Sequence, residues 1–360
     1  MGSKTLFDVP PGATAQVSII DTSLRLSNVA VDYLMAPPVA GFDKFVNCPT
    51  WSFLIQSSAG QKALFDLGVP PDIHTFSPAI VEHLQKSEWS IEVKQHVADI
   101  LKDNGMDFSE IGSIIWSHWH WDHIGDPSTF PGTTEIVVGP GFKDAFLPAY
   151  PTNPDSMLRE SYFEGRNLRE IDFSQQQPRL KAGSLQAFDF FGDGSFYLLN
   201  TPGHAIGHLA GLARTTTNPD TFIFMGGDLC HHAGEIRPSP YLSIPDKVDF
   251  PLPDVLRALI TTCPGGALFR DLNVKRGRGP DQPFFEPVIG HDIPLAIETI
   301  KKAQEADARD DVFFIFAHDA YIMGIVDLFP LRANEWSEKG WAKHVLWSFL
   351  GDLTPAVLAK

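Results

Sequence analysis

A cluster of histidines and aspartates constrains this chain more than any other feature of its sequence. The stretch SHWHWDHIGD begins at Ser117 and holds three of the 13 histidines within six positions. It follows the apolar run GSIIWS, a predicted strand, and Gly125 at its end favours a loop over a helix. Imidazoles and carboxylates are good ligands for zinc and similar divalent ions. We therefore predict that the side chains of this loop converge on one or two metal ions: His118, His120, Asp122 and His123.

The composition indicates which kinds of molecule the protein is expected to bind. Of the 360 residues, 43% are hydrophobic and 20% are charged, as is typical of a soluble globular protein with a full core. No apolar run reaches about 18 residues, so no membrane helix is expected. The formal net charge of -16 disfavours nucleic acid and anionic membranes, which bind clustered Lys and Arg. A neutral or weakly polar small molecule is the expected partner.

The cysteines and the N-terminus bear on the cellular compartment. Cys48, Cys230 and Cys263 are odd in number and widely spaced, so they predict no disulfide framework. Cys230 is expected to be a buried free thiol. The first residues do not have the pattern of a secretory signal. A cytoplasmic location follows as the expectation, and a homodimer is compatible with the sequence, which does not specify the oligomeric state.

Hydrophobic periodicity predicts two groups of strands with helices between and after them. The strands are expected at 15–20, 51–57, 62–68, 112–117, 185–191, 195–200, 208–214, 221–227 and 311–319. The helices are expected at 90–105, 254–262, 292–308 and 334–353. This pattern favours two sheets stacked face to face with helices outside, in a single domain over residues 1–360. Two loop-rich stretches, about 140–180 and 231–290, are predicted to be insertions that cap the site.

The motif HWHWDH at 118–123 resembles the H-x-H-x-D-H signature of the metallo-β-lactamase superfamily. Four further elements match that family: LFDLG with Asp66, TPGH with His204, FIFMGGD ending in Asp228, and FFIFAHD containing His318. The resemblance extends over residues 17–319, most of the chain. It implies an α/β fold in which two mixed β-sheets are flanked by helices, the four-layer αββα sandwich.

The resemblance also implies two divalent metal ions, with zinc expected. One ion would be held by His118, His120 and His204, and the other by Asp122, His123 and His318. Asp228 would lie between them, and Asp66 would support the metal loop. Such a centre is expected to hydrolyse its substrate by attack of a metal-bound hydroxide on a carbonyl carbon. Asp122 or Asp228 would then carry a proton.

The layout is most similar to the lactonase-like branch, especially its fungal relatives that open small lactone or lactam rings. Quorum-quenching lactonases often carry Tyr three residues after the bridging Asp, whereas this chain has His231. His231 or His232 is predicted to bind the substrate and to donate a proton, and His231 is included among the catalytic residues. The alternative is that both are polar loop residues. Trp119 and Trp121 are predicted to form an aromatic substrate wall, the alternative being packing beneath the loop.

The sequence does not exclude three other activities. One is a thioester hydrolase similar to glyoxalase II, and another is an iron-dependent member of the same fold. A binding protein that has kept the ligands without turnover is a third alternative. His208 is expected to support the ligands or to be structural. Five histidines have no motif around them and are expected to be ordinary: His74, His83, His96, His291 and His344.

Overall fold

Two six-stranded sheets form the centre of the computed structural model, which describes residues 7–175, 179–248 and 265–358. The first sheet has the order β1 (Gln16–Asp21), β6 (Trp51–Gln56), β7 (Lys62–Phe65), β9 (Ile111–Ile115), β10 (Glu135–Val138) and β11 (Leu168–Glu170). The second has the order β12 (Leu180–Ala182), β13 (Leu185–Asp189), β14 (Phe196–Asn200), β15 (Leu209–Thr216), β16 (Thr221–Met225) and β18 (Val312–Ile315). Both sheets are mixed, because each contains parallel and antiparallel pairs.

The two sheets bury one face against each other. Side chains alternate between the faces of a strand. Phe53 and Ile115 from the first sheet share one core cluster with Leu198 and Ile223 from the second. Leu54, which directly follows Phe53 in the chain, belongs to a second cluster that also contains side chains from helices. The predicted sandwich of two sheets between helices is thereby confirmed.

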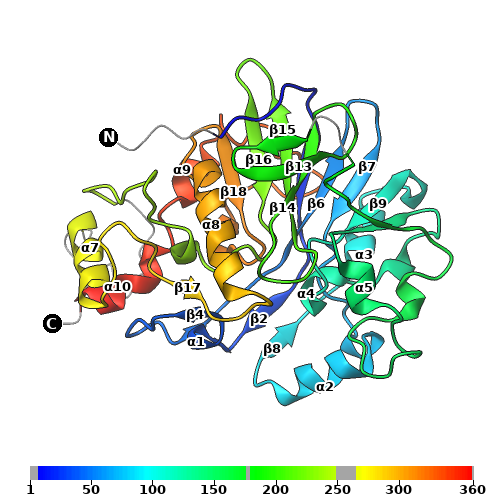
Figure 1. The fold of residues 1–360 in the computed structure, drawn as a ribbon, viewed down its shortest axis with the longest axis horizontal. Coiled ribbons are helices and arrows are strands. Elements are labelled where there is room, and N and C mark those ends of the chain that lie inside the picture. The colour runs from blue at the N-terminus through cyan, green and yellow to red at the C-terminus, as the bar shows by residue number, and fades with distance from the viewer. Residues whose placement is uncertain (1–6, 176–178, 249–264, 359–360) are drawn as a thin grey trace.

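Helices cover the outer faces. Figure 1 shows α8 beside the second sheet, α3 and α5 on the opposite side beside the first, and α7 with α10 at one end. The α-helices are α1 (Val31–Leu34), α2 (Pro78–Lys86), α3 (Val97–Asp103), α4 (Trp121–Ile124), α5 (Phe142–Phe146), α7 (Gly266–Lys275), α8 (Ile293–Asp307), α9 (Trp341–Val345) and α10 (Leu350–Leu358). Short paired strands complete the structure: β2 (Arg25–Ser27) with β8 (Ser90–Glu92), β3 (Val29–Ala30) with β5 (Lys44–Phe45), and β4 (Met35–Ala36) with β17 (Glu286–Pro287).

The long helix α8 agrees with the prediction and has an identifiable start. The Asp292 side chain accepts a hydrogen bond from the Leu295 amide at 3.0 Å and so caps the first turn. Ala296, Ile300 and Ala303 recur at helical spacing and are buried. This stripe places α8 against the sheet next to β18.

Three predicted elements differ from the structure. The helix expected from Ser90 begins only at Val97, because Ser90–Glu92 pairs with Arg25–Ser27 as a strand. The predicted C-terminal helix is divided into α9 and α10, and Gly340 at the start of α9 has a left-handed φ of 69°. The histidine loop ends in the helical turn α4 instead of staying a loop throughout. The helix expected at 254–262 lies outside the described residues.

No helix within the described ranges is both long and apolar enough to cross a membrane.

Candidate metal centre

All seven predicted ligands follow the carboxyl ends of strands. Four of them, from His118 to His123, come after β9, and His204 follows β14. Asp228 and His318 follow β16 and β18, which are parallel to each other. β14 and β16 both pair antiparallel with β15, so their carboxyl ends share one edge of the second sheet. The sandwich therefore brings ligands from both sheets to one place.

A first group contains His118, His120, His204 and Asp228. Their ligand atoms all lie within 4.8 Å of one another. Asp228 Oδ2 lies 3.6 Å from His118 Nε2 and 3.5 Å from His204 Nε2. His120 Nδ1 lies 2.9 Å from His204 Nε2. Three imidazoles and one carboxylate are a suitable donor set for a zinc-like ion.

A second group contains Asp122, His123, His318 and again Asp228, with ligand atoms within the same 4.8 Å of one another. Asp228 Oδ1 lies 3.1 Å from both His123 Nε2 and His318 Nε2. Asp122 Oδ2 lies 3.6 Å from His318 Nε2. Asp228 thus directs one oxygen to each group.

The buried donor atoms fit a pair of cations. Asp228 Oδ1, His118 Nε2 and His123 Nε2 are buried, and within the described part of the chain none of them makes a hydrogen bond of suitable geometry. A buried polar atom without a partner costs roughly 1–3 kcal/mol. Coordination to a divalent ion would remove this cost, and the residue types are those that such ions bind.

The electrostatic environment differs between the two groups. Burial and the neighbouring histidines hold the pKa of His118 well below its usual value, and burial lowers the pKa of His120 to about 3. Both imidazoles are therefore neutral and present a lone pair. Burial also opposes a charge on His123, but Asp228 and Asp66 outweigh it and raise the pKa of His123 well above the usual value. This direction favours a protonated imidazole, so a cation bound there would have to displace the proton.

Asp66 orients the histidine loop from behind. It follows β7 and has a left-handed φ of 61°, a conformation that Asp tolerates better than most residues. Its carboxylate accepts hydrogen bonds from the amide (2.6 Å) and hydroxyl (2.8 Å) of Ser117. Its Oδ2 also lies 2.7 Å from His123 Nδ1. This contact keeps Nε2 of His123 directed toward Asp228.

His208 supports Asp228 in a similar way. The Asp228 amide donates to His208 Nε2 at 3.1 Å, so the ring proton lies on Nδ1. That nitrogen is 2.9 Å from the carbonyl oxygen of Thr201. Burial lowers the pKa of His208 to about 4, which keeps the ring neutral. His208 therefore positions the backbone of Asp228 and does not belong to either ligand group.

The two consecutive histidines after Asp228 have different surroundings. His231 lines the cavity beside the metal groups, with Nε2 3.6 Å from Asp228 Oδ2 and Nδ1 3.7 Å from Glu235 Oε2. His232 lies outside the cavity lining. Its Nε2 is 3.3 Å from Asp352 Oδ2 in α10, and its ring packs against aromatic side chains such as Phe285. Of this pair, His231 therefore lines the cavity and His232 does not.

The ligand groups open into a cavity of about 240 Å³. Trp119 and Trp121 line it, as do several residues that sequence analysis did not identify: Leu26, Tyr33, Cys48, Ile80, His83, Trp89 and Met157. Most of these come from the β2–β8 region before the histidine cluster. No local pattern marks them, because they reach the cavity only through tertiary packing. The two loop-rich stretches contribute Met157, His231 and Ile289 to this lining.

Comparison with known proteins gives the family to which the sequence is similar. The family model of the metallo-beta-lactamase superfamily matches residues 46–213. The chain is 45% identical over 352 residues to "Gamma-lactamase FDB1" of Fusarium pseudograminearum, covering 95% of this chain and 83% of that protein. It is 41% identical over 358 residues to "Cytochrome P450 monooxygenase mpaDE" of Penicillium roqueforti. That alignment covers 98% of this chain but only 39% of the other protein.

A solved structure has a similar fold. A crystal structure of a mutant of B. thuringiensis AiiA, with N-decanoyl-L-homoserine bound at its active site, aligns with a TM-score of 0.58. The alignment covers 89% of this chain and 99% of that one at 18% sequence identity. At this identity the similarity concerns the fold.

Proposed function

The chain belongs to the metallo-β-lactamase superfamily, and from this premise we propose that it opens a small cyclic ester or amide at a centre of two divalent ions, with zinc as the expected metal. The general class of the enzyme, a metal-dependent hydrolase of the lactonase and lactamase type, follows from its relatives. The name gamma-lactamase, borne by a protein 45% identical to this chain, supports a cyclic amide as one substrate.

One observation carries the dinuclear proposal, namely that Asp228 belongs to both ligand groups. Its Oδ2 faces His118 and His204, and its Oδ1 faces His123 and His318. A carboxylate with one oxygen in each group is suited to bridging two ions. With a single ion, one group of buried imidazoles would have no metal partner, and each unpaired nitrogen would cost roughly 1–3 kcal/mol.

The residues around the centre suit ring opening. Two divalent ions bound there would lower the pKa of a water molecule to about 7 and polarise the substrate carbonyl. Asp122, at the edge of the second group, accepts a proton from the attacking water. His231 lines the cavity, and its Nε2, which lies next to Asp228, donates a proton to the leaving nitrogen or oxygen, with the carboxylate of Glu235 near Nδ1. Trp119 and Trp121 hold the ring by its apolar faces.

A substrate panel tests the proposal. Zinc-loaded protein is offered lactones, lactams and thioesters, after metal analysis, for which we expect about two ions per chain. Ring opening of a lactone or lactam, lost in Asp228→Ala, is the expected result. In His231→Phe the rate should fall by about 10²–10⁴-fold for lactams, and less for lactones, whose leaving alkoxide needs the proton less than an amide nitrogen does.

Other outcomes would replace the proposal. Hydrolysis of thioesters alone would indicate an activity similar to that of glyoxalase II. Visible absorption by the purified protein, together with loss of activity on replacing the metal by zinc, would indicate an iron-dependent member. Full metal content without turnover of any compound would indicate a binding protein.

A further inference from the structure

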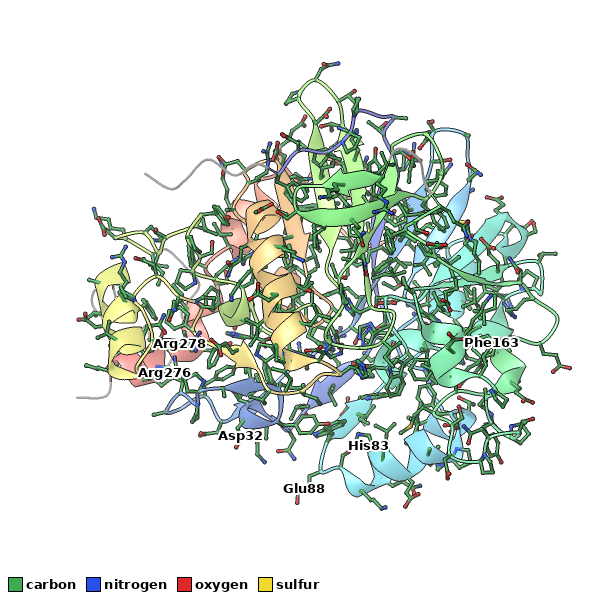
Figure 2. The ribbon with its side chains drawn as sticks, viewed as in Figure 1. Asp32, His83, Glu88, Phe163, Arg276 and Arg278 are labelled. Atoms are coloured by element: carbon green, nitrogen blue, oxygen red, sulfur yellow. The ribbon has the colours of Figure 1, made fainter. Side chains whose placement is uncertain are left out.

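A second space adjoins the metal-side cavity. It has a volume of about 390 Å³ and shares three lining side chains with that cavity: Tyr33, His83 and Trp89. We call it the outer groove; its other lining residues are Asn28, Ala30, Lys44, Lys86, Ser87 and Glu88. Figure 2 shows His83 and Glu88 together at the lower edge of the molecule, on and just after α2. The groove therefore lies at the surface, next to the cavity.

A run of aromatic contacts connects the two spaces. Trp121, which directly precedes the candidate ligand Asp122, stacks on Trp89 with ring centroids 6.2 Å apart and an interplanar angle of 21°. Tyr33 meets Trp89 edge-on at 5.5 Å, and His83 does so at 5.6 Å. These side chains come from α1, α2, α4 and the segment before β8. Trp89 is the member that contacts all the others.

The volumes suggest that a substrate uses both spaces. Ligand pockets commonly measure about 300–1,000 Å³. The metal-side cavity, at about 240 Å³, is below this range, whereas the two spaces together lie within it. A bare ring would leave the outer groove to water.

The polar residues of the outer groove indicate what kind of group it accepts. Lys44 Nζ donates to Asn28 Oδ1 at 2.6 Å, and Lys86 is paired with Glu82. The carboxylate of Glu88 adds the opposite charge. Both lysines are thus engaged by neighbours and most of the accessible lining is apolar, so the groove matches an uncharged, largely apolar group better than an anion.

From these observations we propose that Trp89 is a specificity-determining residue, with Tyr33 and His83 beside it. The reacting ring lies at the metal centre, and an uncharged, largely apolar substituent of that ring crosses the face of Trp89 into the outer groove. This inference rests on the proposed function, because it assumes that the ring is opened at the metal centre.

The test compares two lactones in zinc-loaded protein. One is γ-butyrolactone, and the other is the same ring with a substituent that contains a phenyl ring and a diethylene glycol ether. We expect kcat/KM to be higher for the extended lactone. In Trp89→Ala this preference should fall by about tenfold, the loss of one aromatic contact. Trp89→Leu keeps apolar volume without the aromatic face and should show a similar loss if Trp89→Ala does not fold. Gln85→Ala changes an exposed residue of α2 that lines neither space, and should keep the preference.

A binding measurement accompanies the kinetics. Calorimetry with the ring-opened products of both lactones should show tighter binding of the extended product, and Trp89→Ala should abolish the difference. Equal kcat/KM and equal affinity for both compounds in the wild type would overturn the role of Trp89, while leaving ring opening intact. Hydrolysis of no lactone or lactam of the substrate panel, with the extended product still bound more tightly, would overturn the proposed function and leave the groove as a binding site.

Discussion

His123 illustrates how single contacts prepare this centre. Its Nδ1 is held by Asp66 at 2.7 Å, and its Nε2 faces Asp228 at 3.1 Å. The role of one ring nitrogen is set by what the other contacts. The supporting carboxylate is itself fixed by two hydrogen bonds from Ser117, so a residue 57 positions earlier in the chain determines which atom of His123 is available.

Asp66→Asn tests this arrangement with little change of shape. Asn tolerates the left-handed backbone and keeps the oxygen that accepts from the Ser117 amide, whereas the Ser117 hydroxyl, which donates to Oδ2, loses its acceptor. Its amide NH₂ would replace the oxygen facing His123 Nδ1, which favours the tautomer with the proton on Nε2. We expect metal affinity to fall by about 10- to 100-fold, measured by competition with a chelator. Asp352→Asn, which changes the carboxylate next to His232 outside the cavity, serves as the control. Unchanged affinity in Asp66→Asn would contradict the role of Asp66.

At the scale of elements, the segment carrying His204 is fixed by the start of α8. The Asp292 amide donates to the carbonyl of Gly203 at 2.8 Å, and the His291 amide donates to that of His204 at 2.9 Å. Gly203 has a φ of 128°, and a Cβ there would lie 2.2 Å from the backbone nitrogen of Ala296. The glycine of TPGH is thus required by its contact with a helix about 90 positions later.

Gly203→Ala should therefore lower stability and weaken metal binding together. A clash with backbone cannot be relieved by a side-chain rotation, so we expect a loss of about 1–3 kcal/mol, measured by denaturant unfolding. Gly60→Ala is a matched control, because Gly60 also has a positive φ of 87° but has no atom within 4 Å of the added Cβ. Its loss should be smaller, with metal content unchanged. Equal losses in the two variants would show that the contact with α8 is unimportant.

At the scale of the whole molecule, the candidate centre joins the two sheets. The histidine loop follows β9 in the first sheet, whereas His204, Asp228 and His318 follow strands of the second. Ions bound there would connect the halves of the sandwich at one edge. The unfolded chain does not hold these residues together, so metal binding should stabilise the folded state.

Removal of metal should accordingly lower the melting temperature. At a free metal concentration 100 times the Kd, the stabilisation would be about 2.7 kcal/mol per site. Differential scanning calorimetry of chelator-treated and zinc-reloaded protein measures the effect, and Asp228→Ala should show a smaller difference between the two. A melting temperature that stays the same after complete loss of metal would contradict this expectation.

The sequence by itself determined the family, the α/β sandwich and the identity of the seven residues that meet at the centre. These features are readable locally, because each candidate ligand directly follows an apolar strand or lies in a short motif. The strand ends then share one edge once the sheets form. That these side chains bind two ions stays a prediction.

Only the tertiary structure decided the surroundings of that centre. Ser90–Glu92 became a strand because Arg25–Ser27 supplied a pairing partner, and Trp89 before it reached the cavity for the same reason. His231 and His232 are adjacent and chemically alike, yet one faces the cavity and the other packs near α10. Such features depend on contacts between residues far apart in the chain, and local sequence patterns do not predict those contacts.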